Sequence, residues 1–295
     1  MNKPIYKTVH KSKKRAAFVR LVGFAGLLLL ALTFGFRAQK STLASSARQG
    51  AQSQAQNPAA KWEPDIEKFE QADKANPPKP GMIVFAGSSS FVRWSTLIND
   101  MKPLEVTNRG FGGSQMSDLD YYAKRIVNVY RPKAVLVYEG DNDLAASSPK
   151  TPEMVAEDYR QFVQIVRGDL PDTWIYFISI KPSKLRWNEW PKMKAANAMI
   201  QDFARTQKRV EYIDVASPMF DAQGNLPGDL FVSDGLHPTP KCYALWTSII
   251  KPILLARFGG SANAWPGVGT QPWANSRAGN ALAFATLRSL AELPN

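Results

Sequence analysis

Five short apolar segments, separated by stretches with helical patterning, constrain the fold of this chain more than any other feature. Each segment is four to seven residues long, which suits a strand buried on both faces of a sheet. The segments cover residues 82–86, 104–107, 133–138, 174–180 and 210–215, and helices are predicted at 64–74, 92–101, 116–130, 152–168, 188–207 and 239–257. This alternation predicts an α/β fold, a three-layer α/β/α sandwich around a mostly parallel five-stranded sheet.

The basic residues gather at the N-terminus, and this distribution bears on the class of partner. The chain has a formal net charge of +12, and residues 1–60 hold ten lysines and arginines and no acidic residue. Removing these ten from the 37 basic residues leaves 27 against 25 acidic residues, a net charge of +2 for the rest. A nucleic-acid-binding fold carries a basic face of its own, so no nucleic-acid partner is expected.

Residues 1–36 have the pattern of a membrane-targeting segment. A basic flank, residues 1–20, precedes an apolar run of 16 residues at 21–36; no clean small-x-small cleavage site lies just after Phe36, and there is no lipobox cysteine. Basic flanks stay in the cytoplasm. We therefore expect a single N-terminal anchor in a bacterial inner membrane, with the rest of the chain in the periplasm. Secretion after cleavage of a signal peptide is the alternative.

A linker, a folded domain and an extension are predicted after the apolar run. Residues 37–60 are rich in Ala, Ser and Gln without apolar periodicity, which indicates a flexible linker. Residues 61–258 contain the alternating strands and helices and form the predicted domain. Residues 259–295 form a Gly-, Pro- and Trp-rich extension with a predicted helix at 280–291. Cys242 is the single cysteine, so no disulfide can form within the chain.

Two segments carry residues suited to nucleophilic catalysis. Three serines, Ser88 to Ser90, follow the first apolar segment, where active sites of parallel sheets lie, although a plain turn is the alternative. A serine nucleophile needs a base. His10 lies in the basic flank, so an exported site can use only His237. Asp234 could accept a hydrogen bond from the Nδ1–H of His237. An ordinary Asp-Gly turn is the alternative for this second segment.

Two further strand ends carry unusual residues. The segment 106–119 contains three glycines, which let the backbone approach a ligand and present N–H groups, or which simply form a flexible turn. The segment 137–144 crowds Glu139, Asp141, Asn142 and Asp143 together. Its carboxylates could hold Ca²⁺ or Mg²⁺, whereas a zinc site would lack histidine and cysteine ligands. The Asn142 amide could instead donate to an oxyanion. No metal or cofactor is expected.

In order and spacing, these four segments resemble the four blocks of the SGNH hydrolases, also called the GDSL esterase/lipase family. The blocks read GSSS, NRGFGG, GDND and DGLH, with Ser88 standing where Asp is usual. The resemblance covers residues 82–258 and implies a flavodoxin-like sheet. The forms GSSSFVRW and ISIKPSKLRW are similar to a bacterial subgroup near the platelet-activating-factor acetylhydrolase-like members.

The resemblance implies a role for each matched residue. Ser89 aligns with the nucleophile, His237 with the base and Asp234 with the acid that orients it. The implied oxyanion hole consists of the Ser89 N–H, the Gly113 N–H and the Asn142 side chain. The departure at Ser88 removes a carboxylate that is not a triad member, so it bears on the surroundings of Ser89 more than on the mechanism.

Several residues near these blocks are candidates for substrate contacts. Arg93 and Trp94 could line the pocket, with a helix-surface charge and core packing as the alternatives. Trp187 and its neighbour Trp190 could stack on a sugar ring, or pack over the edge of the sheet. Arg186 could hold an anionic group, although we expect it to be solvated.

The sequence therefore predicts a serine esterase that acts through an acyl-enzyme. Its expected substrates are small-molecule or glycan esters, with short acyl groups such as acetyl on a carbohydrate or small alcohol. Three alternatives stay open: a lipase or lysophospholipase of the same family, acyl transfer onto a cell-envelope acceptor, and a non-catalytic envelope-binding protein that retains the fold.

Overall fold

The computed structural model describes residues 58–260 of the chain. The chain divides into two units after Glu63. Of the first unit, the described residues comprise the 3-10 helix η1 (Pro58–Trp62) and Glu63. The second unit contains the sheet and its helices. None of the helices in residues 58–260 is long and apolar enough to cross a membrane. The predicted anchor at 21–36 and the predicted helix at 280–291 lie outside the described residues.

Five parallel strands form the sheet, in the order β2-β1-β3-β4-β5. They are β1 (Ile83–Gly87), β2 (Val106–Gly110), β3 (Ala134–Tyr138), β4 (Trp174–Ile178) and β5 (Val210–Ile213). This is the strand order of flavodoxin-like folds, in which the order reverses between β1 and β3. The predicted α/β fold with a five-stranded parallel sheet is therefore confirmed.

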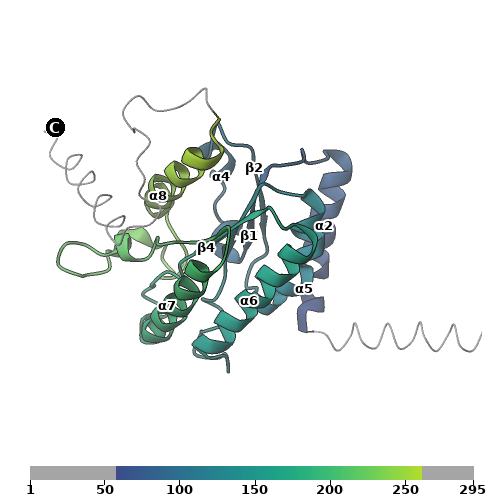
Figure 1. Cartoon of the computed structure of the whole chain (residues 1–295). Coiled ribbons are helices and arrows are strands. Elements are labelled where there is room, and N and C mark those ends of the chain that lie inside the picture. Colours follow the sequence, from purple (N-terminus) through teal and green to yellow (C-terminus); the bar gives the residue numbers. More distant parts are fainter. Residues whose placement is uncertain (1–57, 261–295) are drawn as a thin grey trace, which may run out of the picture. The chain divides into compact units, whose positions relative to one another are not determined.

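Helices cover both faces of the sheet (Figure 1). They are α2 (Glu63–Ala75), α3 (Ser89–Val92), α4 (Leu97–Asp100), α5 (Met116–Ile126), α6 (Pro152–Asp169), α7 (Trp190–Thr206) and α8 (Pro240–Phe258). Four 3-10 helices lie between them: η2 (Asn128–Tyr130), η3 (Trp187–Glu189), η4 (Ser217–Met219) and η5 (Gly228–Leu230). The two longest helices begin alike, with a capping threonine followed by proline: Thr151 accepts from the Met154 N–H, and Thr239 from the Cys242 N–H.

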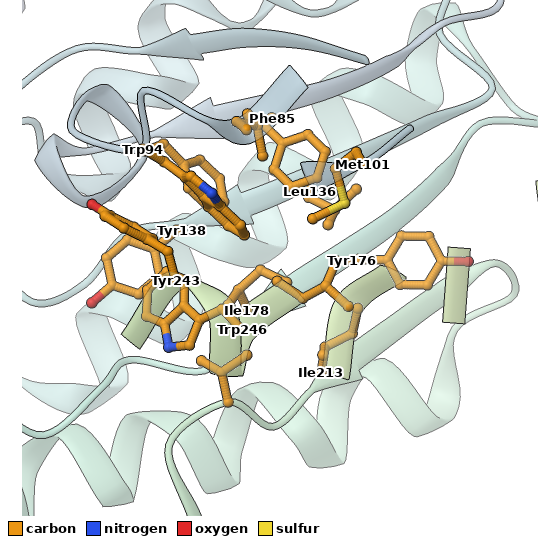
Figure 2. Close-up of a cluster of buried hydrophobic side chains, with 14 of the residues drawn as sticks. Phe85, Trp94, Met101, Leu136, Tyr138, Tyr176, Ile178, Ile213, Tyr243 and Trp246 are labelled. Carbon is orange, nitrogen blue, oxygen red and sulfur yellow. The ribbon is translucent and has the colours of Figure 1, made fainter. Parts of the chain in front are cut away.

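Alternation of side chains along the strands builds the two buried layers. On one face, a large aromatic cluster lies between the sheet and α8, and Figure 2 shows Trp94, Tyr138, Tyr243 and Trp246 within it. On the other face, the helices α5, α6 and α7 pack side by side. Tyr159 of α6 meets Phe177 of β4 there at 4.9 Å between ring centroids. The carboxyl ends of all five strands consequently share one edge of a sheet covered on both sides.

Several predicted elements differ from the structure, and the helix predicted at 116–130 is α5, which ends at Ile126, followed by the separate 3-10 helix η2. The predicted helix at 92–101 is instead two short helices, α3 and α4, because a turn at Arg93 to Ser95 interrupts it. The strand predicted at 104–107 runs on to Gly110 as β2. Polar side chains fit in this strand because they find partners: Arg109 bonds Asp73 at 2.5 Å and Tyr130 at 2.6 Å.

Candidate active site

Ser89 stands at the carboxyl end of β1. The strand ends at Gly87, Ser88 donates its N–H to the Tyr138 carbonyl at 3.0 Å, and Ser89 is the first residue of α3. Gly87 has φ +151°, and a Cβ there would lie 2.2 Å from the Tyr138 oxygen. Only glycine therefore fits where the chain turns out of the sheet, and this turn presents Ser89 above the strand ends.

Asp234 and His237 share one short loop between η5 and α8. The Val232 N–H donates to the His237 carbonyl at 2.9 Å and closes the loop. Within it, Asp234 Oδ1 accepts from the N–H groups of Leu236 at 2.8 Å and His237 at 2.9 Å. Asp234 Oδ2 lies 2.6 Å from His237 Nδ1. Desolvation would raise the pKa of Asp234, but the hydrogen bonds from His237 and Leu236 outweigh it and hold the pKa below its usual range.

The structure brings these two segments together into one hydrogen-bonded chain. His237 Nε2 lies 3.0 Å from Ser89 Oγ, across a separation of 148 residues. With the Nδ1 proton directed to the Asp234 carboxylate, Nε2 is left as the acceptor for the Ser89 hydroxyl. A base is thus within reach of the Ser89 proton, and a carboxylate orients the base.

Gly112, Gly113 and Asn142 come to the same edge of the sheet from two neighbouring loops. A Cβ on Gly112 would lie 3.8 Å from the Ser89 Cβ. Within residues 58–260, the main-chain N–H groups of Ser89 and Gly113 make no hydrogen bond. Asn142 donates through Nδ2 to Ser88 Oγ at 2.7 Å and to the Ser114 carbonyl at 3.0 Å. Its amide is therefore held firmly beside the Ser88–Ser89 turn.

A buried ionic network lies behind Asn142. The two oxygens of the Asp141 carboxylate accept hydrogen bonds from Arg186 Nη1 at 2.5 Å, Lys181 Nζ at 2.9 Å and the Tyr138 hydroxyl at 3.1 Å. Arg186 also donates through Nη2 to Asn142 Oδ1 at 2.9 Å. Burial would raise the pKa of Asp141, but the charges of Lys181 and Arg186 outweigh it and lower this pKa to about 2. Asp141 is therefore a carboxylate at neutral pH.

Glu139 is a second buried carboxyl group, and its protonation state differs from that of Asp141. Burial, reinforced by the charge of Asp143, raises the pKa of Glu139 well above its usual value. Ser114 Oγ lies 2.6 Å from Glu139 Oε1 and 2.8 Å from the Phe111 carbonyl. A hydroxyl has one hydrogen, so a protonated Glu139 satisfies both contacts by donating to Ser114. In the described part of the chain, no group of His, Cys, Asp and Glu side chains could hold a metal ion.

The predicted substrate-contact residues lie in different environments in the structure. Arg93 is exposed at the end of α3, and Trp187 is 47% exposed and packs beside Phe220. Trp94 is only 1% exposed, stacks on Tyr243 at 5.0 Å and bonds Asp100. The prediction that Trp94 lines a pocket is therefore wrong, because its ring fills the core between the sheet and α8.

Arg186 is the residue whose environment the sequence interpretation got wrong. We expected a solvated side chain, but it is 16% exposed and bonds both Asp141 and Asn142. The signal was present in the sequence, since the crowded carboxylates at 139–143 need cationic partners when they are buried. The sequence does not show which cations supply them, because Lys181 and Arg186 lie 40 and 45 residues further along the chain.

An open cavity of about 570 Å³ lies away from this site. Its lining includes Lys133, Trp174 and Arg209, which stand at or next to the amino ends of β3, β4 and β5. None of the residues of the Ser89 site lines it, so we assign it no part in the chemistry.

Comparison with known families identifies the chain. The model of the GDSL-like Lipase/Acylhydrolase family matches residues 74–245, more than half of the chain, and the chain belongs to that family. It is an ester hydrolase of the SGNH type. No curated protein sequence matches it.

Solved structures share the fold at low sequence identity. A proposed acylhydrolase from Bacteroides fragilis is 20% identical, with a TM-score of 0.57 over 68% of this chain and 98% of its own. A protein from Streptococcus pneumoniae, described as a proposed platelet activating factor, is 21% identical, with a TM-score of 0.58 over 72% and 99%. A GDSL-like lipase from Bacteroides thetaiotaomicron is 17% identical, with a TM-score of 0.57 over 65% and 98%. The match covers nearly the whole length of each of the three solved chains, so the likeness supports the fold.

Proposed function

We propose that this ester hydrolase works through a triad of Ser89, His237 and Asp234 and an acyl-enzyme intermediate. The observation that carries the proposal is the hydrogen-bonded chain from Ser89 Oγ through the His237 ring to Asp234, with distances of 3.0 Å and 2.6 Å. Nucleophile, base and orienting acid in this arrangement are the requirements of serine catalysis.

In the proposed mechanism, His237 Nε2 takes the Ser89 proton while Ser89 Oγ attacks the carbonyl carbon of the ester. The protonated His237 then gives that proton to the leaving alcohol as the carbon–oxygen bond breaks, which leaves an acyl group on Ser89. Water repeats the sequence and releases the acid. Asp234 stays charged throughout and stabilises the imidazolium.

We assign the oxyanion hole to the Ser89 N–H, the Gly113 N–H and the Asn142 side chain. The two main-chain donors have no hydrogen-bond partner in the described residues, which leaves them available to a substrate oxygen. Both hydrogens of Asn142 Nδ2 already have acceptors, so Asn142 would share one of them with the oxyanion in a three-centre bond. Each well-placed donor is worth about 10²- to 10³-fold in kcat.

We further propose short acyl esters of carbohydrates or small alcohols as substrates. The loop after β4 carries Leu185 and Trp187, which are 63% and 47% exposed, and the Leu185 N–H bonds the Gly235 carbonyl at 3.0 Å. This bond joins the loop to the segment that holds Asp234 and His237. The exposed indole of Trp187, two residues after this bond, offers a face on which a sugar ring can stack.

The decisive experiment compares the full wild-type chain with Ser89→Ala on p-nitrophenyl esters of increasing acyl length and on acetylated glycans. We expect hydrolysis that is fastest for acetyl esters and that falls at least about 10³-fold in the variant. Ser90→Ala, one residue further along α3, is the matched control and should stay active. Activity that persists in Ser89→Ala would refute the nucleophile, and a maximum at long chains would favour a lipase.

Residues 1–36 carry a separate proposal about location. Their basic flank and apolar run support an anchor in a bacterial inner membrane, with the ester hydrolase in the periplasm. Fractionation of cells that express the full chain tests this, because an anchored protein stays with membranes after a carbonate wash. Recovery of a shortened chain in the soluble fraction would indicate a cleaved signal.

A further inference from the structure

The loop after β4 places Arg186 across the carboxyl end of β3, where it touches two consecutive residues. Its Nη1 donates to the carbonyl and the carboxylate of Asp141, at 2.6 Å and 2.5 Å, and its Nη2 donates to Asn142 Oδ1 at 2.9 Å. We infer that Arg186 is a positioning residue for catalysis, which orients and polarises the Asn142 amide as an oxyanion donor. The inference rests on the proposed function of Asn142.

The orientation follows from the chemistry of the two groups. A guanidinium has only donors, so it can bond only the oxygen of the Asn142 amide. With Oδ1 fixed on Arg186, Nδ2 must face Ser88 Oγ and the Ser114 carbonyl, at 2.7 Å and 3.0 Å. A flipped amide would set its NH₂ group against the guanidinium and its oxygen against the Ser114 carbonyl. Arg186 therefore selects the orientation that aims hydrogens at the turn before Ser89.

Arg186 is itself held rigidly enough to do this. Its planar fork bonds Asp141 through Nη1 and Asn142 through Nη2, a two-nitrogen geometry that lysine cannot reproduce. On the loop, the Arg186 N–H donates to Ser183 Oγ at 3.2 Å. The Asp141 carboxylate is fixed from the other side by Lys181 and by the Tyr138 hydroxyl. The orientation of Asn142 is thus tied to β3 and to the loop after β4.

The network also carries charge that suits an oxyanion. Two cations, Lys181 and Arg186, share one carboxylate, Asp141, and all three side chains are at least four-fifths buried. The nearby Asp143 pairs with another cation, Lys150, at 2.9 Å, and Asp158 shares that cation at 2.7 Å. Within the group of Lys181, Arg186 and Asp141, one positive charge is therefore in excess directly behind Asn142. A cation on the amide oxygen makes the N–H a stronger donor, and it favours negative charge that develops beyond it.

A kinetic double-mutant cycle separates this role from simple support of the loop. Full chains of Arg186→Ala, Asn142→Ala and the double variant are compared on p-nitrophenyl acetate. We expect Arg186→Ala to lower kcat about 10- to 100-fold with little change in KM, and Asn142→Ala to lower it about 10²- to 10³-fold. Because Arg186 acts through Asn142, adding Arg186→Ala to the Asn142→Ala variant should lower kcat by a further factor of less than about 3.

Two further variants sharpen the cycle. Arg186→Lys keeps the charge but not the fork, and should give an intermediate kcat. Lys184→Ala, two residues earlier and exposed on the same loop, should match the wild type. If Arg186→Ala lowers kcat by the same factor in the wild-type and Asn142→Ala backgrounds, the inference is overturned. A wild-type kcat in Arg186→Ala would overturn it as well.

A second measurement needs no turnover, so it stands even if the proposed function fails. The side-chain amide signal of Asn142 can be assigned as the one absent from the NMR spectrum of Asn142→Asp. We expect this signal to be distinct in the wild type and to move toward the position of solvated amides in Arg186→Ala, but not in Lys184→Ala. An unmoved signal in Arg186→Ala would overturn the inference. Absence of ester hydrolysis in the wild type would instead overturn the proposed function alone.

Discussion

At the scale of single residues, Asp234 has a donor on each of its carboxylate oxygens. Oδ1 accepts two main-chain N–H groups, and Oδ2 faces His237 Nδ1. The side chain is nevertheless 38% exposed, so its place depends on these bonds and not on packing. A substitution there can change the chemistry of the site while the fold stays intact.

Asp234→Asn is expected to lower kcat about 10³- to 10⁴-fold on p-nitrophenyl acetate. The amide oxygen can still accept the two main-chain bonds, but an amide N–H facing Nδ1 favours the tautomer whose Nε2 carries the proton. That tautomer cannot accept the Ser89 proton. Thermal unfolding should stay within about 2 °C of the wild type. Asp229→Asn, an exposed residue paired with Lys241, is the control and should keep full activity; a similar loss there would refute this account.

Residue-level prediction from the sequence depended on local motifs. Ser89, Asp234 and His237 could be named because each lies in a short block of distinctive residues. Trp94 and Arg186 could not be placed, because an aromatic ring suits a pocket and a core equally. An arginine likewise reveals its partner only when distant loops meet. Their environments follow from the packing of α8 and from the path of the loop after β4.

At the scale of elements, glycines have opposite effects on β1 and on α6. Gly87 ends β1 with positive φ, and a Cβ there would meet the main chain of β3. Gly168 lies exposed near the end of α6, and a Cβ there would meet no atom within 4 Å. The same substitution therefore tests two different demands on the backbone.

We expect Gly87→Ala to destabilise the fold by about 3 kcal/mol or more, because β1 and β3 must separate to admit the methyl group. Ester hydrolysis should fall with it, since Ser89 follows two residues later. Gly168→Ala should stabilise the protein by about 0.5–1 kcal/mol through the higher helix propensity of alanine. Denaturant titrations of both full-length variants measure these changes. An unchanged stability of Gly87→Ala would contradict the close approach of the two strands.

The strands were predictable in number and type, and the bounds of strands and helices less so. Apolar runs located the cores of all five strands, because buried parallel strands are continuously apolar. The end of β2 was missed because Asn108 and Arg109 are polar, and only tertiary partners make them compatible with a strand. The break between α3 and α4 was missed for a similar reason, since Trp94 bonds Asp100 and shapes the turn.

At the scale of the whole folded unit, stability should respond to a buried acid away from the triad. Asp120 of α5 is 8% exposed, and its Oδ1 has no hydrogen-bond partner among residues 58–260. Burial, with the charge of Asp158, raises its pKa to about 8 despite the opposing charge of Lys150. The folded protein therefore holds a proton that the unfolded chain releases above about pH 4. This difference lowers stability as the pH rises from about 4 to about 8.

Asp120→Asn should remove that dependence. Near pH 4 the protonated acid and the amide are both neutral, so variant and wild type should unfold at similar temperatures. At pH 9 the wild type carries a buried charge, and the variant should unfold at least about 2–4 °C higher, the shift that about 1 kcal/mol produces in a chain of this size. Asp202→Asn, exposed on α7, is the control. A difference that does not grow with pH would contradict the raised pKa.

The separation of the triad residues along the chain has a consequence for folding kinetics. The Asp234–His237 contact spans three residues inside a closed loop, whereas the His237–Ser89 contact spans 148. Closing a loop of three residues costs little entropy, and closing the long one requires the sheet and α8 to be assembled first. Recovery of ester hydrolysis during refolding should consequently trail the return of helical signal, and the rate of this recovery would report the last long-range step of assembly.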